Sequence, residues 1–174
     1  MMKRLVSLVM VALLLSCSMA YATDLGSIFG GLTSMFGFGE ETTYGVGEPA
    51  ETDGVTITLV DVFESKGSNY YTPAKGNEHL IFEFSVKNGS KEELALSTLL
   101  SFSLNCDGTL YSISFEALSS AMLSGKVQLD TVIKPGKNFK GVVGYEVPLN
   151  WKEARVEFTK DAFFGETIVF KVEK

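Results

Sequence analysis

Apolar and polar residues alternate with a period of two over much of the chain beyond residue 54. The segment 55–59 places valine, isoleucine and leucine between threonines, and Val62 continues that pattern after a slip of one residue. The segment 80–86 alternates in the same way and runs into the turn residues Asn88-Gly89-Ser90. This period predicts two strands, the second with one face buried and one face in water.

The remaining apolar segments are also short and lie between turn signals. Asp107-Gly108 is typical of a tight hairpin, and Pro135-Gly136 is typical of a β-turn. Residues 116–124 predict a short helical or irregular excursion. The further strands are expected near 102–104, 110–113, 141–147, 156–158 and 168–172. Seven or eight strands without a strand–helix–strand rhythm predict an all-β antiparallel sandwich over residues 54–174.

The first 22 residues have the pattern of a secretory signal peptide. Lys3 and Arg4 precede the apolar run Leu5–Leu15, and Ala20-Tyr21-Ala22 supplies small residues at a cleavage site. A membrane-spanning helix would need about 20 apolar residues in succession. We therefore expect residues 1–22 to be a leader and the chain to act outside the cytoplasm.

Cys17 opens a second route of processing. Leu14-Leu15-Ser16-Cys17 resembles the bacterial lipobox, in which the cysteine is lipidated and becomes the first residue. Leu15 is bulkier than the residue usual at its position. Cleavage after Ala22 and lipidation of Cys17 both remain open, and a lipid anchor at Cys17 is the only membrane attachment that we expect.

Residues 23–53 differ in composition from the rest and are expected to form a linker. Glycine and phenylalanine dominate its first part and carboxylates its last part. Glycine disfavours a persistent helix by about 1 kcal/mol per residue, which favours a flexible tether. The alternative is a helical apolar face that contacts a bilayer or a partner, formed by Ile28, Leu32, Met35 and Phe36.

Composition excludes several classes of function. The net charge is −6 and the isoelectric point is near 4.9, whereas a nucleic-acid binder needs a basic face. After processing, Cys106 is the only thiol and His79 the only imidazole. We interpret Cys106 as a small buried residue and His79 as a strand-edge residue, which leaves no nucleophile–base pair.

Acidic residues gather before the first strand, at Glu40, Glu41, Glu48, Glu51 and Asp53. Paired carboxylates can hydrolyse glycosides or bind calcium, but no EF-hand spacing is present. A solvated linker is the simpler interpretation. We therefore predict no catalytic residues, no cofactor and no metal.

Several motifs together resemble a known family. Gly76-Asn77-Glu78-His79-Leu80, Asp107-Gly108-Thr109-Leu110-Tyr111 and Tyr145-Glu146-Val147-Pro148 occur in the order found in small secreted immunoglobulin-like domains of unknown function. These domains are grouped with the mycobacterial immunoprotective extracellular antigens. The resemblance covers about residues 46–172 and implies an immunoglobulin-like β-sandwich without agreed catalytic residues. It also implies that Asn88 satisfies backbone groups at a strand end.

The segment 65–77 is the most promising place for recognition. Tyr70 and Tyr71 lie among glycine, serine and asparagine, and exposed tyrosines are common in binding loops. The alternative is that a tyrosine folds back onto the sandwich. We expect a non-catalytic, extracytoplasmic binding module for a protein or an envelope glycan. The alternative function is a structural envelope spacer or assembly subunit that works through its tether and its strand edges.

Overall fold

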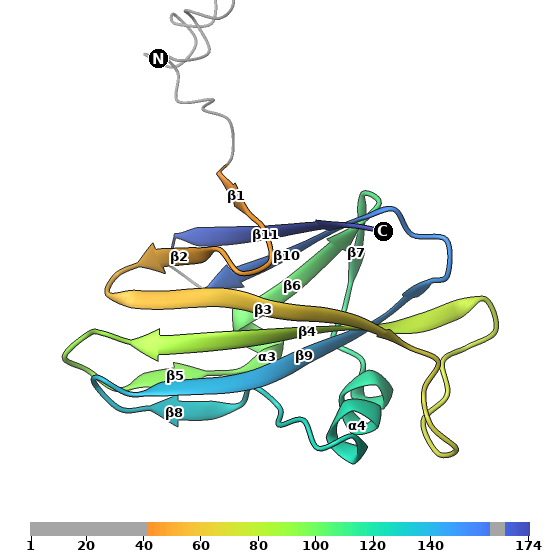
Figure 1. Ribbon diagram of the computed structural model, residues 1–174, viewed down its shortest axis with the longest axis horizontal. Helices are drawn as coiled ribbons and strands as arrows, with labels where there is room; N and C mark the ends of the chain where they lie inside the picture. Colours follow the sequence, from red (N-terminus) through yellow and green to blue (C-terminus); the bar gives the residue numbers. More distant parts are fainter. Residues whose placement is uncertain (1–41, 161–165) are drawn as a thin grey trace, which may run out of the picture. The chain divides into compact units, whose positions relative to one another are not determined.

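Two sheets stacked face to face account for most of the residues that the computed structural model describes, which are 42–160 and 166–174 (Figure 1). The predicted signal peptide, Cys17 and the Gly/Phe-rich segment lie outside the described residues. No helix within the two described ranges is both long and apolar enough to cross a membrane.

The first sheet has four antiparallel strands in the order β2-β3-β4-β9. They are β2 (Pro49–Thr52), β3 (Val55–Ser65), β4 (Asn77–Asn88) and β9 (Asn138–Pro148).

The second sheet has the order β1-β11-β10-β6-β7. Its strands are β1 (Thr43–Tyr44), β11 (Thr167–Glu173), β10 (Glu153–Thr159), β6 (Phe102–Cys106) and β7 (Thr109–Tyr111). All neighbours are antiparallel except β1, which runs parallel to β11. The smaller elements are β5 (Leu94–Leu96), paired with β8 (Thr131–Ile133), and the helices α3 (Thr98–Ser101) and α4 (Phe115–Leu123). The predicted all-β sandwich is confirmed.

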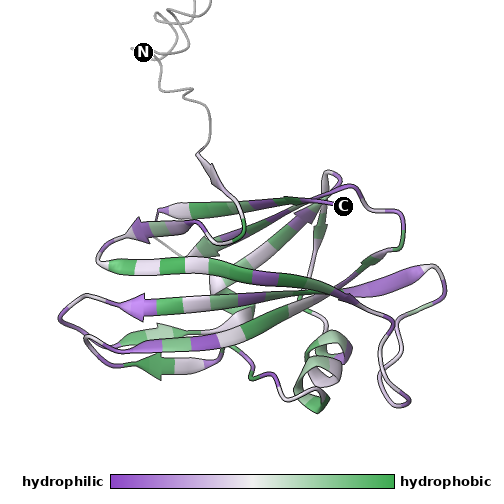
Figure 2. Ribbon diagram, viewed as in Figure 1, coloured by the Kyte–Doolittle hydropathy of each residue, from purple (hydrophilic) through white to green (hydrophobic). Residues whose placement is uncertain are grey.

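The core lies between the two sheets and is filled by the alternating apolar residues (Figure 2). The ring centroid of Phe84 on β4 lies 5.2 Å from that of Phe102 on β6 and 5.3 Å from that of Phe170 on β11. These aromatic contacts join the two layers. Cys106 is a free, buried thiol. The sandwich is therefore held by its core without a disulfide at Cys106, because burial of apolar area is the main favourable term in folding.

Two local predictions are confirmed at the level of single residues. The slip expected before Val62 is a register shift between Leu59 and Asp61 in the pairing of β3 with β4. The turn between β6 and β7 has positive φ at both Asp107 (49°) and Gly108 (80°), as the Asp-Gly signal predicts.

The prediction of one wet face on β4 is wrong for half of the strand. Ile81 and Glu83 point to the outer face and are buried, because α4 covers Ile81 and Lys126 and Lys140 pair with Glu83. Leu118 and Ala121 of α4 pack on Ile81 of β4 and Val142 of β9. The helix starts at the expected place, where Ser114 accepts a hydrogen bond from the backbone N–H of Ala117 at 3.1 Å.

The sandwich begins earlier in the sequence than residue 54. Strands β1 and β2 lie within the expected linker 23–53, and β2 pairs with β3 from Pro49↔Thr58 to Thr52↔Val55. Their short length and mixed composition hide them from a search for alternation. The segment 42–53 therefore belongs to the folded body.

Asn88 has the structural role implied by the resemblance. Its side chain is fully buried and donates to the carbonyls of Glu92 at 2.7 Å and Ile133 at 2.8 Å. Its Oδ1 accepts from the backbone N–H of Ser90 at 3.0 Å and from the Ser90 hydroxyl at 2.7 Å. Asn88-Gly89-Ser90 is thus a structural turn, as the sequence predicts, and all the polar atoms of the Asn88 side chain are hydrogen-bonded within it or to Glu92 and Ile133.

Candidate functional site

The loop that joins β3 to β4 projects from one end of the first sheet and presents Tyr70 to solvent (Figure 1). We call residues 66–76 the tyrosine loop. The Tyr70 side chain is 85% exposed, and Tyr71 is half-buried. The two tyrosines singled out in the sequence therefore differ: Tyr70 is exposed to solvent, and Tyr71 is partly covered.

The tyrosine loop is held in one shape by hydrogen bonds around Ser68. The Ser68 N–H donates to the carbonyl of Tyr71 at 2.9 Å, and the Ser68 hydroxyl accepts from the N–H of Tyr71 at 3.2 Å. The Thr72 hydroxyl donates to the Ser68 carbonyl at 2.9 Å. Gly67, with φ of +83°, permits this close turn, because a Cβ there would lie 2.1 Å from the Tyr71 carbonyl oxygen. Tyr70 is therefore presented by an ordered backbone.

The base of the tyrosine loop is tied to the rest of the first sheet. One carboxylate oxygen of Glu146 on β9 accepts from the N–H of Ala74 at 3.1 Å and from the amide of Asn77 at 2.8 Å. The carbonyl of Gly76 accepts from the N–H of Leu149 at 3.0 Å. The loop thus keeps a fixed position relative to the segment that follows β9.

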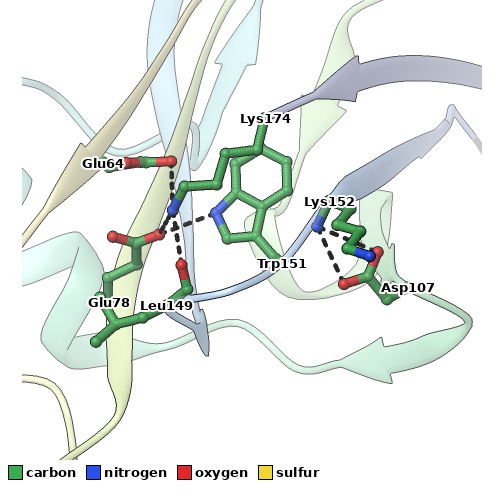
Figure 3. A network of polar contacts seen from close by, with 7 residues as sticks. All are labelled: Glu64, Glu78, Asp107, Leu149, Trp151, Lys152 and Lys174. Carbon is green, nitrogen blue, oxygen red and sulfur yellow. Dashed lines mark hydrogen bonds and ion pairs between the residues drawn. The ribbon is translucent and has the colours of Figure 1, made fainter.

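That segment contributes to a second feature at the same end, which we call the Lys174 site (Figure 3). The Lys174 ammonium donates to Glu78 at 2.5 Å, to Glu64 at 2.9 Å and to the carbonyl of Leu149 at 2.9 Å. It also lies 5.3 Å from the ring centroid of Trp151. The Trp151 Nε1 donates to Glu78 at 2.9 Å. These five residues come from β3, β4, the segment after β9 and the residue after β11.

Burial distinguishes this network from a surface ion pair. The Glu78 side chain is 6% exposed and Trp151 is 4% exposed, whereas Lys174 and Glu64 reach solvent. The hydrogen bond to Glu78 raises the pKa of Lys174 above its ordinary value, and the one to Glu64 adds to it. Sequence reasoning missed this site because no motif links residues 64, 78, 149, 151 and 174.

A groove of about 540 Å³ opens beside the Lys174 site. Its lining combines the charged residues Glu64, Glu173 and Lys174 with the apolar residues Val46, Val62, Leu80, Trp151 and Val172. Of the apolar residues, Val46, Val62 and Val172 reach the surface, whereas Leu80 and Trp151 are buried. Apolar and charged groups side by side suit a ligand with a short apolar body and a charged head.

The interpretation of His79 as a strand-edge residue is wrong. His79 is fully buried on the outer face of β4, opposite Ser65 of β3 and Glu146 of β9. Neither of its ring nitrogens has a hydrogen-bond partner within the described residues. Burial lowers the pKa of His79, against the smaller opposing effects of the carboxylates of Glu146 and Glu116. His79 is therefore a neutral residue of the packed face.

Cys106 behaves as the sequence predicts. It is 1% exposed in the core between the sheets, and burial raises the pKa of its thiol to about 11, with Asp107 adding to the rise. Cys106 belongs to the second sheet and faces the core, whereas His79 lies on the outer face of the first. They do not form a nucleophile–base pair.

The acidic residues before the first predicted strand do not gather into a site in the part that is described. Glu51 lies on β2, and Glu48 accepts from the N–H of Gly45 at 2.7 Å. Within residues 42–160 and 166–174, no three His, Cys, Asp or Glu side chains lie close enough to hold a metal ion. Glu40 and Glu41 lie outside the described residues.

A buried carboxylate on the outer face is also explained by structure. Glu83 forms ion pairs with Lys126 at 3.0 Å and Lys140 at 2.9 Å. Burial alone would raise the pKa of Glu83, but the hydrogen bonds from Lys140 and Lys126 together outweigh it and lower that pKa. This arrangement links the segment after α4 to β4 and β9. Each carboxylate oxygen of Glu83 is paired with a lysine.

Solved structures share this fold. The yjhA protein of Bacillus subtilis is 16% identical with a TM-score of 0.57, over 75% of this chain and 100% of that one. The secreted protein MPT63 of Mycobacterium tuberculosis is 15% identical with a TM-score of 0.51, over 77% and 98%. The ycdA protein of Bacillus subtilis, a candidate lipoprotein, is 16% identical with a TM-score of 0.58, over 72% and 38%. The similarity thus spans well under half of the ycdA chain.

At these identities the likeness extends to the fold alone. No curated protein matches the chain. The model of one protein family matches residues 44–171, which is nearly the whole of the described body. The chain therefore belongs to the family described as a domain of unknown function, DUF4352.

Proposed function

We propose that this protein is a non-catalytic, extracytoplasmic binding module that recognises its partner, a protein or an envelope glycan, through the tyrosine loop. The observation that carries the proposal is Tyr70, a large side chain that is 85% exposed on an internally bonded loop. A flexible loop would lose conformational freedom on binding, whereas an ordered loop has already lost it on folding. Tyrosine adds a large contact area with few rotatable bonds.

The extracytoplasmic location is supported by two independent observations. The first 22 residues have the pattern of a secretory leader. The structures of similar fold include a secreted mycobacterial protein and a candidate lipoprotein of Bacillus subtilis. Cleavage after Ala22 would release the chain, and lipidation of Cys17 would anchor it.

The sheet edges give less support to assembly through strand pairing. The edge strands β1, β2 and β7 have only two to four residues each. The edge of β9 is partly covered, because the N–H of Ser114 donates to Gly144 and the N–H of Leu129 donates to Val142. Short or covered edges limit edge-to-edge association. The state of these edges therefore favours recognition by the loop over a spacer built on strand edges.

The test is affinity capture with the full chain, followed by a measured dissociation constant for the captured partner. Truncation of a central interface tyrosine costs about 2 kcal/mol or more, which is a weakening of about 30-fold. We expect Tyr70→Ala to weaken binding by that factor without changing the urea midpoint. Leu99→Ala is the matched control, because Leu99 is 69% exposed on α3 and should leave binding unchanged.

Equal binding by the wild type and the Tyr70→Ala variant would overturn the proposal for the loop. Protease added to intact cells tests the location separately. Digestion of the native protein from outside, with a cytoplasmic marker left whole, is expected.

A further inference from the structure

The ammonium of Lys174 is more completely surrounded than that of an ordinary surface lysine. An ammonium has three N–H donors, and here each finds an acceptor: Glu78, Glu64 and the Leu149 carbonyl (Figure 3). The face of Trp151 lies 5.3 Å from the nitrogen, within the range of a cation–π contact. The Lys174 site therefore has the composition of a receptor for a primary ammonium.

The site retains its need for a cation when Lys174 is absent. The Glu78 carboxylate is 6% exposed, and its other partner at the site is the neutral indole of Trp151. Glu64 would add a second negative charge beside it. A buried carboxylate without a counter-charge is strongly unfavourable, so an external cation would be drawn to the site.

Lys174 can leave without disturbing the sheets. Strand β11 ends at Glu173, and beyond it one backbone hydrogen bond, from the N–H of Lys174 to the carbonyl of Lys152 at 2.9 Å, holds the residue. Among the residues that the structure describes, its other bonds are those of the side-chain network. Lys174 thus occupies the site as an intramolecular ligand that another ammonium can replace.

The surroundings favour an organic cation over a metal ion. The site offers two carboxylates, one carbonyl and an aromatic face, at most five oxygen atoms, whereas calcium takes six to eight oxygens. The lining of the adjoining groove of about 540 Å³ includes the partly exposed side chains of Val62 and Val172. A short aliphatic chain behind the ammonium would lie against these two valines.

We propose that the Lys174 site binds a primary alkylammonium group from outside, in exchange for the side chain of Lys174. The group has the chemistry of a lysine side chain and of a free alkylamine. This site does not include Tyr70, so its failure would leave the proposed function untouched, and the reverse also holds.

Trp151 is the single tryptophan of the chain, so its fluorescence and its indole N–H resonance report on this site alone. The full chain is titrated with n-butylammonium and with Nα-acetyl-lysine methylamide. Their neutral counterparts are n-butanol and Nα-acetyl-norleucine methylamide. Tighter binding of n-butylammonium indicates a free amine as the source, and tighter binding of Nα-acetyl-lysine methylamide indicates a peptide-borne lysine. Either preference supports the proposal.

We expect Lys174→Ala to bind n-butylammonium at least tenfold more tightly than the wild type, because the competing lysine is removed. Adding Glu78→Gln to Lys174→Ala should weaken binding by tenfold or more. Glu64→Gln, at an exposed position, gives the same test where the buried change prevents folding. Lys152→Ala is the matched control. Its bond to Asp107 uses the Lys152 backbone N–H, so the variant keeps that bond and should bind n-butylammonium with the affinity of the wild type.

Three results would overturn the proposal. The first is equal affinity of the wild type and Lys174→Ala for n-butylammonium. The second is equal binding of n-butanol, which would show that the charge is not recognised. The third is a calcium chloride titration of Lys174→Ala that shifts the Trp151 indole resonance at lower concentration than n-butylammonium.

Discussion

Replacement of Gly67 by alanine tests whether the tyrosine loop is held as the hydrogen bonds indicate. The added Cβ would lie 2.1 Å from the Tyr71 carbonyl oxygen and 2.9 Å from Cα of Thr72, so the backbone must move. Gly76 provides a matched control in the same loop. It also has positive φ, at +92°, but a Cβ there meets nothing within 4 Å.

The two changes share one energetic term and differ in a second. Holding a non-glycine residue in the left-handed region costs about 1–2 kcal/mol in both variants. In Gly67→Ala the displaced Tyr71 carbonyl also loses the bond from Ser68, which is 2.9 Å long, and the linked bonds weaken. At about 1 kcal/mol for each net hydrogen bond, we expect a total of about 2–4 kcal/mol for Gly67→Ala. Gly76→Ala should cost about 1–2 kcal/mol.

Urea denaturation followed by Trp151 fluorescence measures both free energies of unfolding. Amide hydrogen exchange then locates the change, because the Ser68 N–H should lose protection in Gly67→Ala and keep it in Gly76→Ala. The Gly67→Ala variant should also bind the partner less well, since Tyr70 is no longer presented. Equal costs for the two variants, with the Ser68 amide protected in both, would refute the account of the loop.

Three further predictions concern the body of the sandwich. Asn88→Ala removes the amide that donates to the carbonyls of Glu92 and Ile133, the second of which is a buried bond, and should lower the free energy of unfolding by about 3 kcal/mol in urea denaturation. The exposed Asn138→Ala should change it by less than about 0.5 kcal/mol, so similar losses would contradict the role of Asn88. Because the pKa of His79 is lowered in the folded state, the unfolded chain binds more protons, and stability should fall as the pH drops below about 6.5. The slope is at most about 1.4 kcal/mol per pH unit, and an unchanged pH profile in His79→Leu would disprove this assignment. Cys106, whose pKa is raised to about 11, should react with a thiol reagent only in urea, and reaction in the folded chain at neutral pH would show that the thiol is accessible.

The long strands could be predicted because their alternation is strong. The segments 55–59 and 80–86 carry a clear period of two, and even the slip before Val62 matches a register shift. Asp107-Gly108 and Pro135-Gly136 specify their turns through local backbone preference. Strands β1 and β2 were missed because two to four residues carry no usable period.

The burial of His79 could not be predicted because it depends on a contact that is distant in sequence. Helix α4, from Phe115 to Leu123, covers the outer face of β4, and no local pattern in residues 77–88 indicates this cover. The Lys174 site has the same origin, since Glu64, Glu78, Trp151 and Lys174 meet only in the folded chain. The exposure of Tyr70 could be anticipated because a polar loop between strong strands is a local signal.

Site-specific photo-crosslinking at Tyr70 tests the central claim most directly. The photoreactive amino acid p-benzoylphenylalanine replaces Tyr70 in the full chain, and the exposed Leu99 on α3 serves as the control position. We expect a discrete adduct at position 70 that is absent at position 99. No adduct at position 70, or the same adducts at both positions, would contradict the central claim.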